Sequence, residues 1–170
     1  IGNNGTLTID ASTITGNTTN DHGGGLTNGG TATIRNGSQI SGNSAVNGGG
    51  GVYNSDTGTL TVENSSISSN AAGWGGGIVN TGPLTITNSS VSDNTTIYTG
   101  GGIQNTGPLT LTNSTISGNS ASQSGGGVFN DRGTLIVDGG AISNNTAADS
   151  CGGLLNGGDS TATLTNTTIS

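Results

Sequence analysis

The stretch Ile103–Gly127, IQNTGPLTLTNSTISGNSASQSGGG, returns in modified form along the whole chain of 170 residues. Most copies carry a glycine triplet, then an aliphatic residue, then an asparagine two places later. At steps of 25 or 26 residues, the aliphatic positions are Ile1, Leu26, Val52, Ile78, Ile103, Val128 and Leu154. A fixed period in this range predicts a solenoid, in which each repeat buries its apolar face against its neighbours.

Side chains within this stretch alternate in the manner of short strands. Leu109 and Leu111 alternate with threonines, which is the period-two pattern of a strand with one buried face. A shorter strand is expected at residues 103–105, and a third near Ile116, after a bend at Asn113. The same apolar positions recur in every repeat, so the core is expected to consist of aliphatic columns along one axis.

This arrangement predicts an all-β fold, a parallel β-helix with about 25–26 residues and three short strands per coil. Six full coils and a partial seventh form a single β-solenoid domain, residues 1–170. Because the last repeat stops partway, we expect a segment of a longer chain or a fibre subunit. The polar, glycine-rich composition would also fit a disordered linker, but a solvated coil gives no reason for the aliphatic period.

Two columns of asparagine share fixed phases in the repeat, and each is predicted to form a ladder of stacked side-chain amides. The first contains Asn3, Asn28, Asn54, Asn80, Asn105, Asn130 and Asn156. The second contains Asn17, Asn43, Asn70, Asn94, Asn119 and Asn145. The glycine triplets are expected to supply positive φ angles or close backbone approach at a corner. A phosphate cradle is the other interpretation, but no P-loop lysine supports it.

The charge of the chain excludes several classes of partner. Net charge is −7, and Arg35 and Arg132 are the only basic side chains apart from one histidine. Nucleic-acid binding needs a basic surface, and so does attraction to anionic membranes. No apolar run is long enough to insert into a membrane. Cys151 is the only cysteine, so it either pairs between chains or remains an inert thiol.

The repeats resemble those of bacterial polymorphic outer-membrane proteins and autotransporter adhesin passengers, within the pectate-lyase-like architecture. Residues 76–78 and 101–103 match the Gly-Gly-aliphatic signature of those repeats. Residues 14–17 and 116–119 match their aliphatic-x-x-Asn signature. The resemblance implies a right-handed parallel β-helix and a secreted or surface-displayed protein. It implies no particular activity.

We predict no catalytic residues, no metal site and no cofactor, and therefore a protein that is not an enzyme. Polysaccharide-cleaving β-helices need paired carboxylates or a calcium site with a basic residue. Here Asp10, Arg35 and Glu63 fall in one outward column, which favours a surface ion-pair ladder. No set of nucleophile, base and orienting residue can be assembled from the sequence.

The variable loops before the glycine triplets carry the least regular residues, and we expect any contact face there. Its candidates are Trp74, Tyr98 and His22. Exposed aromatic rings stack on sugars or anchor protein contacts, so a glycan or a protein is the expected ligand. The alternative is that each ring only covers its own corner. A second expected partner is the protein itself, through end-to-end stacking of coils or through neighbouring repeats.

The expected function is therefore that of a non-enzymatic, extracellular or cell-surface structural and adhesive protein, forming a rod or filament. One alternative is a carbohydrate-binding or carbohydrate-processing β-helix. Another is an ice-binding protein that uses Thr-x-Thr columns, here Thr6, Thr31, Thr59, Thr134 and Thr161 beside Thr8, Thr33, Thr61, Thr85, Thr110 and Thr163. Sequons starting at Asn64, Asn88 and Asn113 recur at one corner and are candidates for glycans.

Overall fold

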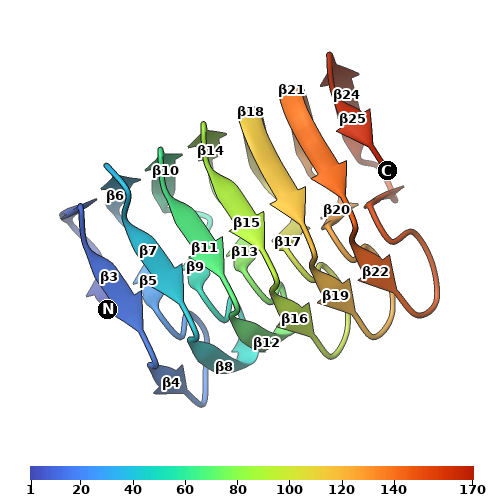
Figure 1. The fold of residues 1–170 in the computed structure, drawn as a ribbon. Helices are drawn as coiled ribbons and strands as arrows, with labels where there is room; N and C mark the ends of the chain where they lie inside the picture. Colours follow the sequence, from blue (N-terminus) through green and yellow to red (C-terminus); the bar gives the residue numbers. More distant parts are fainter.

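The computed structural model describes all residues 1–170, and its regular elements are 25 β-strands that stack as parallel coils along one axis (Figure 1). The predicted fold class, a right-handed parallel β-solenoid, is confirmed. The termini lie in the first and last coils, at opposite ends of the rod (Figure 1). The chain forms no helix of the length and apolarity needed to cross a lipid bilayer.

The strands form three parallel sheets that run the length of the rod. The seven-stranded sheet holds β1 (Gly2–Asn3), β5 (Leu26–Asn28), β9 (Val52–Asn54), β13 (Ile78–Asn80), β17 (Ile103–Asn105), β20 (Val128–Asp131) and β23 (Leu154–Gly157). The six-stranded sheet holds β4 (Thr18–Thr19), β8 (Ser44–Gly48), β12 (Ala71–Trp74), β16 (Thr95–Thr96), β19 (Ser120–Ala121) and β22 (Thr146–Ala147).

The twelve-stranded sheet contains two rows of strands. The first row is β2 (Thr6–Asp10), β6 (Thr31–Arg35), β10 (Thr59–Glu63), β14 (Leu84–Thr87), β18 (Pro108–Ser117), β21 (Thr134–Ser143) and β24 (Thr161–Thr165). The second row is β3 (Thr13–Thr15), β7 (Gln39–Ser41), β11 (Ser66–Ser68), β15 (Ser90–Ser92) and β25 (Thr168–Ile169). Strands β18 and β21 continue across the bend and join both rows into one sheet.

The coil differs from the sequence prediction in one respect, because most coils have four short strands instead of three. The strand predicted at Leu109 and Leu111 and the strand predicted near Ile116 lie in the same twelve-stranded sheet. The six-stranded sheet occupies the start of the segment that the sequence assigned to variable loops. Its strands are two to five residues long and turn only a small residue inward, such as Ala45, Ala72 or Thr96. Such strands carry no hydrophobic alternation for the sequence to show.

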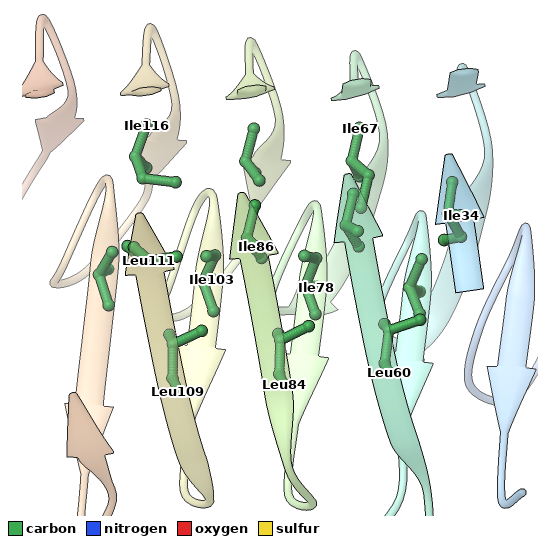
Figure 2. Packing of buried hydrophobic residues seen from close by; sticks show 14 of the residues in the cluster. Ile34, Leu60, Ile67, Ile78, Leu84, Ile86, Ile103, Leu109, Leu111 and Ile116 are labelled. Atoms are coloured by element: carbon green, nitrogen blue, oxygen red, sulfur yellow. The ribbon is translucent and has the colours of Figure 1, made fainter. Parts of the chain in front are cut away.

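The core consists of the predicted aliphatic columns, and it contains 21 buried hydrophobic residues. Leu60, Leu84 and Leu109 are paired in register in successive coils, and Ile78 and Ile103 face them from the seven-stranded sheet (Figure 2). Each of these side chains is at most 3% exposed. Burial of one such side chain contributes about 1.5–3 kcal/mol, so the columns stabilise every coil contact.

The glycine triplets fulfil both predicted roles at the corner that leads into the seven-stranded sheet. The first glycine takes a positive φ, as at Gly75 (53°) and Gly100 (69°). The second approaches neighbouring backbone: a Cβ on Gly76 would lie 2.3 Å from the Thr95 carbonyl oxygen and 2.6 Å from that of Gly101. Cys151 replaces the first glycine of its triplet, has a φ of 57° and is exposed as a free thiol.

Candidate functional site

The first predicted asparagine ladder is present in every coil and is confirmed. Each side-chain Nδ2 donates to the Oδ1 of its counterpart in the next coil, at 2.7–2.9 Å, from Asn3 to Asn156. The five members between Asn28 and Asn130 have no exposed surface. The remaining Nδ2 hydrogen generally reaches a main-chain carbonyl, for example that of Pro83 from Asn54. The ladder therefore satisfies buried polar groups while it fixes the phase between coils.

The second ladder, from Asn17 to Asn145, is also confirmed. Its side-chain amides donate to the next coil at 2.9–3.1 Å. Each Oδ1 from Asn43 to Asn145 also accepts the backbone N–H of the preceding ladder asparagine, at 2.9–3.0 Å. Amides aligned in one direction polarise one another, so each ladder is a cooperative chain of hydrogen bonds.

A third ladder is made of serine and was not predicted from the sequence. Ser65 and Ser89 donate their backbone N–H to the Oγ of Ser89 and Ser114 in the next coil, at 3.0 and 3.2 Å. Their hydroxyls donate to backbone carbonyls two residues earlier. The signal was the repeated Asn-Ser dipeptide, which the sequence analysis assigned only to a bend and to sequons.

The predicted outward column of charges forms only in part. Arg35 pairs with Asp10 through Nη2 and Oδ2 at 2.9 Å, and Asn36 donates to Asp10 Oδ1 at 2.8 Å. The hydrogen bond from Asn36, followed by that from Arg35, holds the pKa of Asp10 below its ordinary value. Glu63 makes no ion pair with Arg35, so the expected ladder stops after one rung. The Arg35 and Asn36 side chains thus occupy both carboxylate oxygens of Asp10, one each.

Of the three candidate contact residues, two meet directly. The Trp74 and Tyr98 rings stack with centroids 4.7 Å apart and an interplanar angle of 28°. They lie in adjacent coils, and both remain more than a third exposed. One face of each ring is covered by the other ring, so a ligand would meet the outer faces and edges of the pair.

His22 lies against a different ring, that of Tyr53, with centroids 4.5 Å apart. Its Nδ1 is buried without a hydrogen-bond partner, above Gly48. Val79 lies near the same glycine: a Cβ built on Gly48 would be 2.9 Å from Val79 Cγ2 and 3.4 Å from His22 Nδ1. Tyr53 and Val79 face outward from the seven-stranded sheet and were missed by the sequence analysis. The structure thus places His22 in a neighbouring cluster, apart from the Trp74–Tyr98 stack.

An apolar notch of about 490 Å³ lies on the six-stranded sheet beside this stack. Val46 and Ile97 stand on its two sides, 62% and 63% exposed, with Gly73 between them in the middle coil. No charged side chain lines the notch. We use the term apolar patch for Val46, Trp74, Ile97 and Tyr98. These four make up half of the eight large hydrophobic residues that the chain exposes.

A second hollow, of about 630 Å³, follows the bend between the two rows of the twelve-stranded sheet. We call it the polar groove. It has no hydrophobic and no charged lining residue; its walls are formed by Gly37, Ser38, Gln39, Asn64, Ser65, Ser66, Asn88, Ser89, Ser90, Asn113 and Thr115. Its surface offers amide and hydroxyl groups, which suits neutral polar ligands.

Chemically reactive groups are spread over the surface. The two ion pairs, Asp10–Arg35 and Asp131–Arg132, and the contact between Asp21 and His22 lie in separate places and are all at least partly exposed. No three His, Cys, Asp or Glu side chains come close enough together to hold a metal ion. The apolar patch and the polar groove offer a ligand ring stacking, apolar contact and hydrogen bonds.

A family model described as the right-handed β-helix region matches residues 1–169. No curated protein and no solved structure matches the chain. The match covers the stacked coils, both asparagine ladders and both hollows. The chain therefore belongs to the right-handed β-helix family.

Proposed function

We propose that the chain is a non-enzymatic structural and adhesive element of the cell surface or extracellular space. The observation that carries this proposal is the pair of unbroken asparagine ladders. Every coil is tied to the next by side-chain bonds as well as by backbone pairing. Six and a half coils at a spacing of about 4.8 Å form a stiff rod of roughly 30 Å. A rod of this kind holds surface groups at fixed intervals.

One feature supports the adhesive part of the proposal, and a second supports the extracellular location. The apolar patch places the Trp74–Tyr98 stack beside the notch between Val46 and Ile97, away from both ends of the rod. Exposed apolar clusters with aromatic members are typical of contact surfaces. The rod has two arginines and no lysine, so trypsin-like proteases find few cleavage sites on it.

The test uses the cells that make the protein. Immunogold labelling is expected on their outer surface, and labelling confined to the cell interior would contradict the proposed location. Cells lacking the gene should lose attachment and regain it with the wild-type chain. The double variant Trp74→Ser, Tyr98→Ser should not restore attachment. Ile136→Ser is the matched control, because Ile136 is as exposed as Trp74 but lies on the twelve-stranded sheet. This variant should restore attachment.

Self-association of the rod is part of the same proposal. In the last coil Leu164 and Ile169 are 39% and 49% exposed, although their counterparts in inner coils are buried. Further coils, from this chain or from a second copy, would cover these side chains and continue the sheets. Electron microscopy of the purified protein tests the second case: filaments are expected, and uniform short rods would exclude polymerisation.

A carbohydrate-binding or carbohydrate-processing β-helix is the second candidate, favoured by the uncharged polar groove. Measuring which glycans the protein retains on a glycan array distinguishes a carbohydrate-binding protein from a rod that binds no carbohydrate. Incubation with a panel of polysaccharides, followed by detection of new reducing ends or unsaturated sugars, separates binding from cleavage. Retained glycan with no product would favour the binding function, and product formation would favour an enzyme.

Ice binding is the third candidate, favoured by the register of the threonine columns. Thr8, Thr33 and Thr61 are paired in successive coils, and so are Thr85 and Thr110. Pro83, Pro108 and Ile136 interrupt the array. Threonine is also common on exposed strand faces for reasons of packing alone. Thermal hysteresis at high protein concentration supports ice binding, and its absence removes this candidate.

A further inference from the structure

Nine asparagines stand in the Asn-X-Ser/Thr sequence that accepts N-linked sugars, namely Asn4, Asn17, Asn36, Asn64, Asn88, Asn94, Asn113, Asn144 and Asn166. Sequence alone does not distinguish among them. The fold does, because it determines whether the side-chain amide is free and whether the hydroxyl two residues later faces the same space.

Asn94 shows how the fold closes a sequon. Its side chain has no exposed surface. One Nδ2 hydrogen bonds to Asn119 Oδ1 at 2.9 Å and the other to the Ile67 carbonyl at 3.1 Å. A sugar on this nitrogen would replace a ladder hydrogen bond and would require space inside the coil. A folded rod therefore cannot carry a sugar at Asn94.

Asn64, Asn88 and Asn113 are in the opposite situation. All three are exposed, and their φ angles of 46°, 48° and 46° turn the side chains outward at the bend of the twelve-stranded sheet. Their carboxamides make no hydrogen bond within the protein. In this left-handed conformation asparagine is the favoured residue after glycine, so the fold positions a free amide in three consecutive coils.

The hydroxyl of each of these sequons lies on the same surface. Asn64 and Ser66, Asn88 and Ser90, and Asn113 and Thr115 all line the polar groove. The middle residue of each sequon is a serine that points inward into the serine ladder. The bend thus directs the acceptor amide and the recognised hydroxyl into one open space of about 630 Å³, whose lining contains no charged residue.

We propose that this corner is a modification site that carries N-linked sugars on Asn64, Asn88 and Asn113. The sugar donor is a hexose activated by a nucleoside diphosphate, used by a separate transferase. The Nδ2 atom forms a bond to the anomeric carbon, and the bond from that carbon to the phosphate oxygen breaks. The nucleoside diphosphate leaves with the electron pair, and the proton that the amide nitrogen loses is released to the surrounding water. The product is a row of sugars along one corner of the rod.

Glycopeptide mapping of the protein isolated from the cells that make it tests this proposal. Hexose-bearing peptides are expected at Asn64, Asn88 and Asn113, and unmodified Asn94 is expected in the same digest. Asn88 and Asn94 are six residues apart, so one peptide reports on both. Absence of sugar from all three corner asparagines would overturn the proposal, and so would a sugar on Asn94 in folded protein.

A second experiment separates the role of the fold from that of the sequon. The folded chain and an unfolded peptide spanning residues 84–99 are treated with an N-glycosyltransferase and UDP-glucose. The peptide should gain glucose at both Asn88 and Asn94, whereas of these two the folded chain should gain it only at Asn88. Ser90→Ala should abolish modification of Asn88 while Asn64 and Asn113 still react, since Ser90 points away from the core. Equal reaction of Asn88 and Asn94 in the folded chain would contradict the structural assignment.

Discussion

Asn80 donates its side-chain amide to Asn105 Oδ1 at 2.8 Å, and neither side chain has any exposed surface. The same bond recurs between each pair of successive coils along this ladder. A one-residue slip of a coil would turn inward residues outward and would break these bonds, so the ladder fixes the register that the aliphatic columns also require. The stiffness proposed for the rod depends on this agreement between polar and apolar columns.

Replacing Asn80 by Ala should be strongly destabilising. It leaves the Asn54 amide without its acceptor and Asn105 Oδ1 without its donor, both fully buried. Two unsatisfied groups at about 1–3 kcal/mol each predict a loss of about 2–6 kcal/mol in the free energy of unfolding by urea. Asn17→Ala is the control at an exposed ladder end and should cost less than about 1 kcal/mol. Equal losses would show that burial of the ladder does not matter.

The close contact of coils at the glycine triplets predicts a second large effect. Gly76→Ala places a methyl group 2.3 Å from the Thr95 carbonyl oxygen, so the backbones of neighbouring coils must separate. We expect a loss of about 3 kcal/mol in urea unfolding. Gly5→Ala is the matched control, because no atom lies within 4 Å of the new methyl group and φ is not positive there. It should change stability by less than about 0.5 kcal/mol.

Cys151→Gly should stabilise the chain. Cys151 has a positive φ at a position where five other repeats use glycine. The left-handed conformation costs a non-glycine residue about 1–2 kcal/mol, while the greater freedom of glycine in the unfolded chain offsets about 0.5–1 kcal/mol. Urea unfolding in the presence of a reductant should therefore show a gain of about 0.5–1 kcal/mol. Cys151→Ala keeps the strain and should show no gain; equal behaviour of both variants would contradict this explanation.

Asn36→Ala should raise the pKa of Asp10 toward its ordinary value, measured by NMR titration of the carboxyl group. The pKa of Asp10 is lowered by the hydrogen bond from Asn36 and then by Arg35. Because the pKa of Asp10 is lower in the folded chain than in the unfolded chain, the ionised carboxylate stabilises the fold. This stabilisation is present above the unfolded pKa and disappears as pH falls through the folded pKa. Asn88→Ala is the control, because Asn88 has a similar φ and no contact with Asp10. An unchanged Asp10 pKa in Asn36→Ala would rule out the proposed cause.

The fold and both asparagine ladders could be predicted because they repeat in phase. Leu109 and Asn105 recur at fixed steps, and stacking turns a period in sequence into a column in space. The six-stranded sheet could not be predicted, since strands such as Thr95–Thr96 are short and turn only one small side chain inward. Thr96 is buried there, whereas its apolar neighbour Ile97 is 63% exposed, so hydrophobicity gives no indication of which side chain faces the core.

The contact residues were harder to predict than the fold because they depend on side-chain direction between coils. Trp74 and Tyr98 were both assigned to variable loops, but Trp74 ends strand β12, and the stacking of the two rings between adjacent coils was not predicted. The pairing of His22 with Tyr53 joins the loop before β5 to the outer face of β9, the strand paired with β5. Nothing in the repeat period specifies such a contact. The same limitation explains why the sequence analysis expected Glu63 to join Asp10 and Arg35, although Glu63 forms no ion pair with Arg35.

Hydrogen exchange of the asparagine carboxamides, followed by NMR, tests the stacked coils most directly. The account predicts slow exchange at Nδ2 of Asn28, Asn54, Asn80 and Asn105, because opening of these bonds requires separation of coils. It predicts rapid exchange at Asn64, Asn88 and Asn113, which are exposed and without a partner. Rapid exchange at all seven carboxamides would contradict the ladder and, with it, the rigid rod.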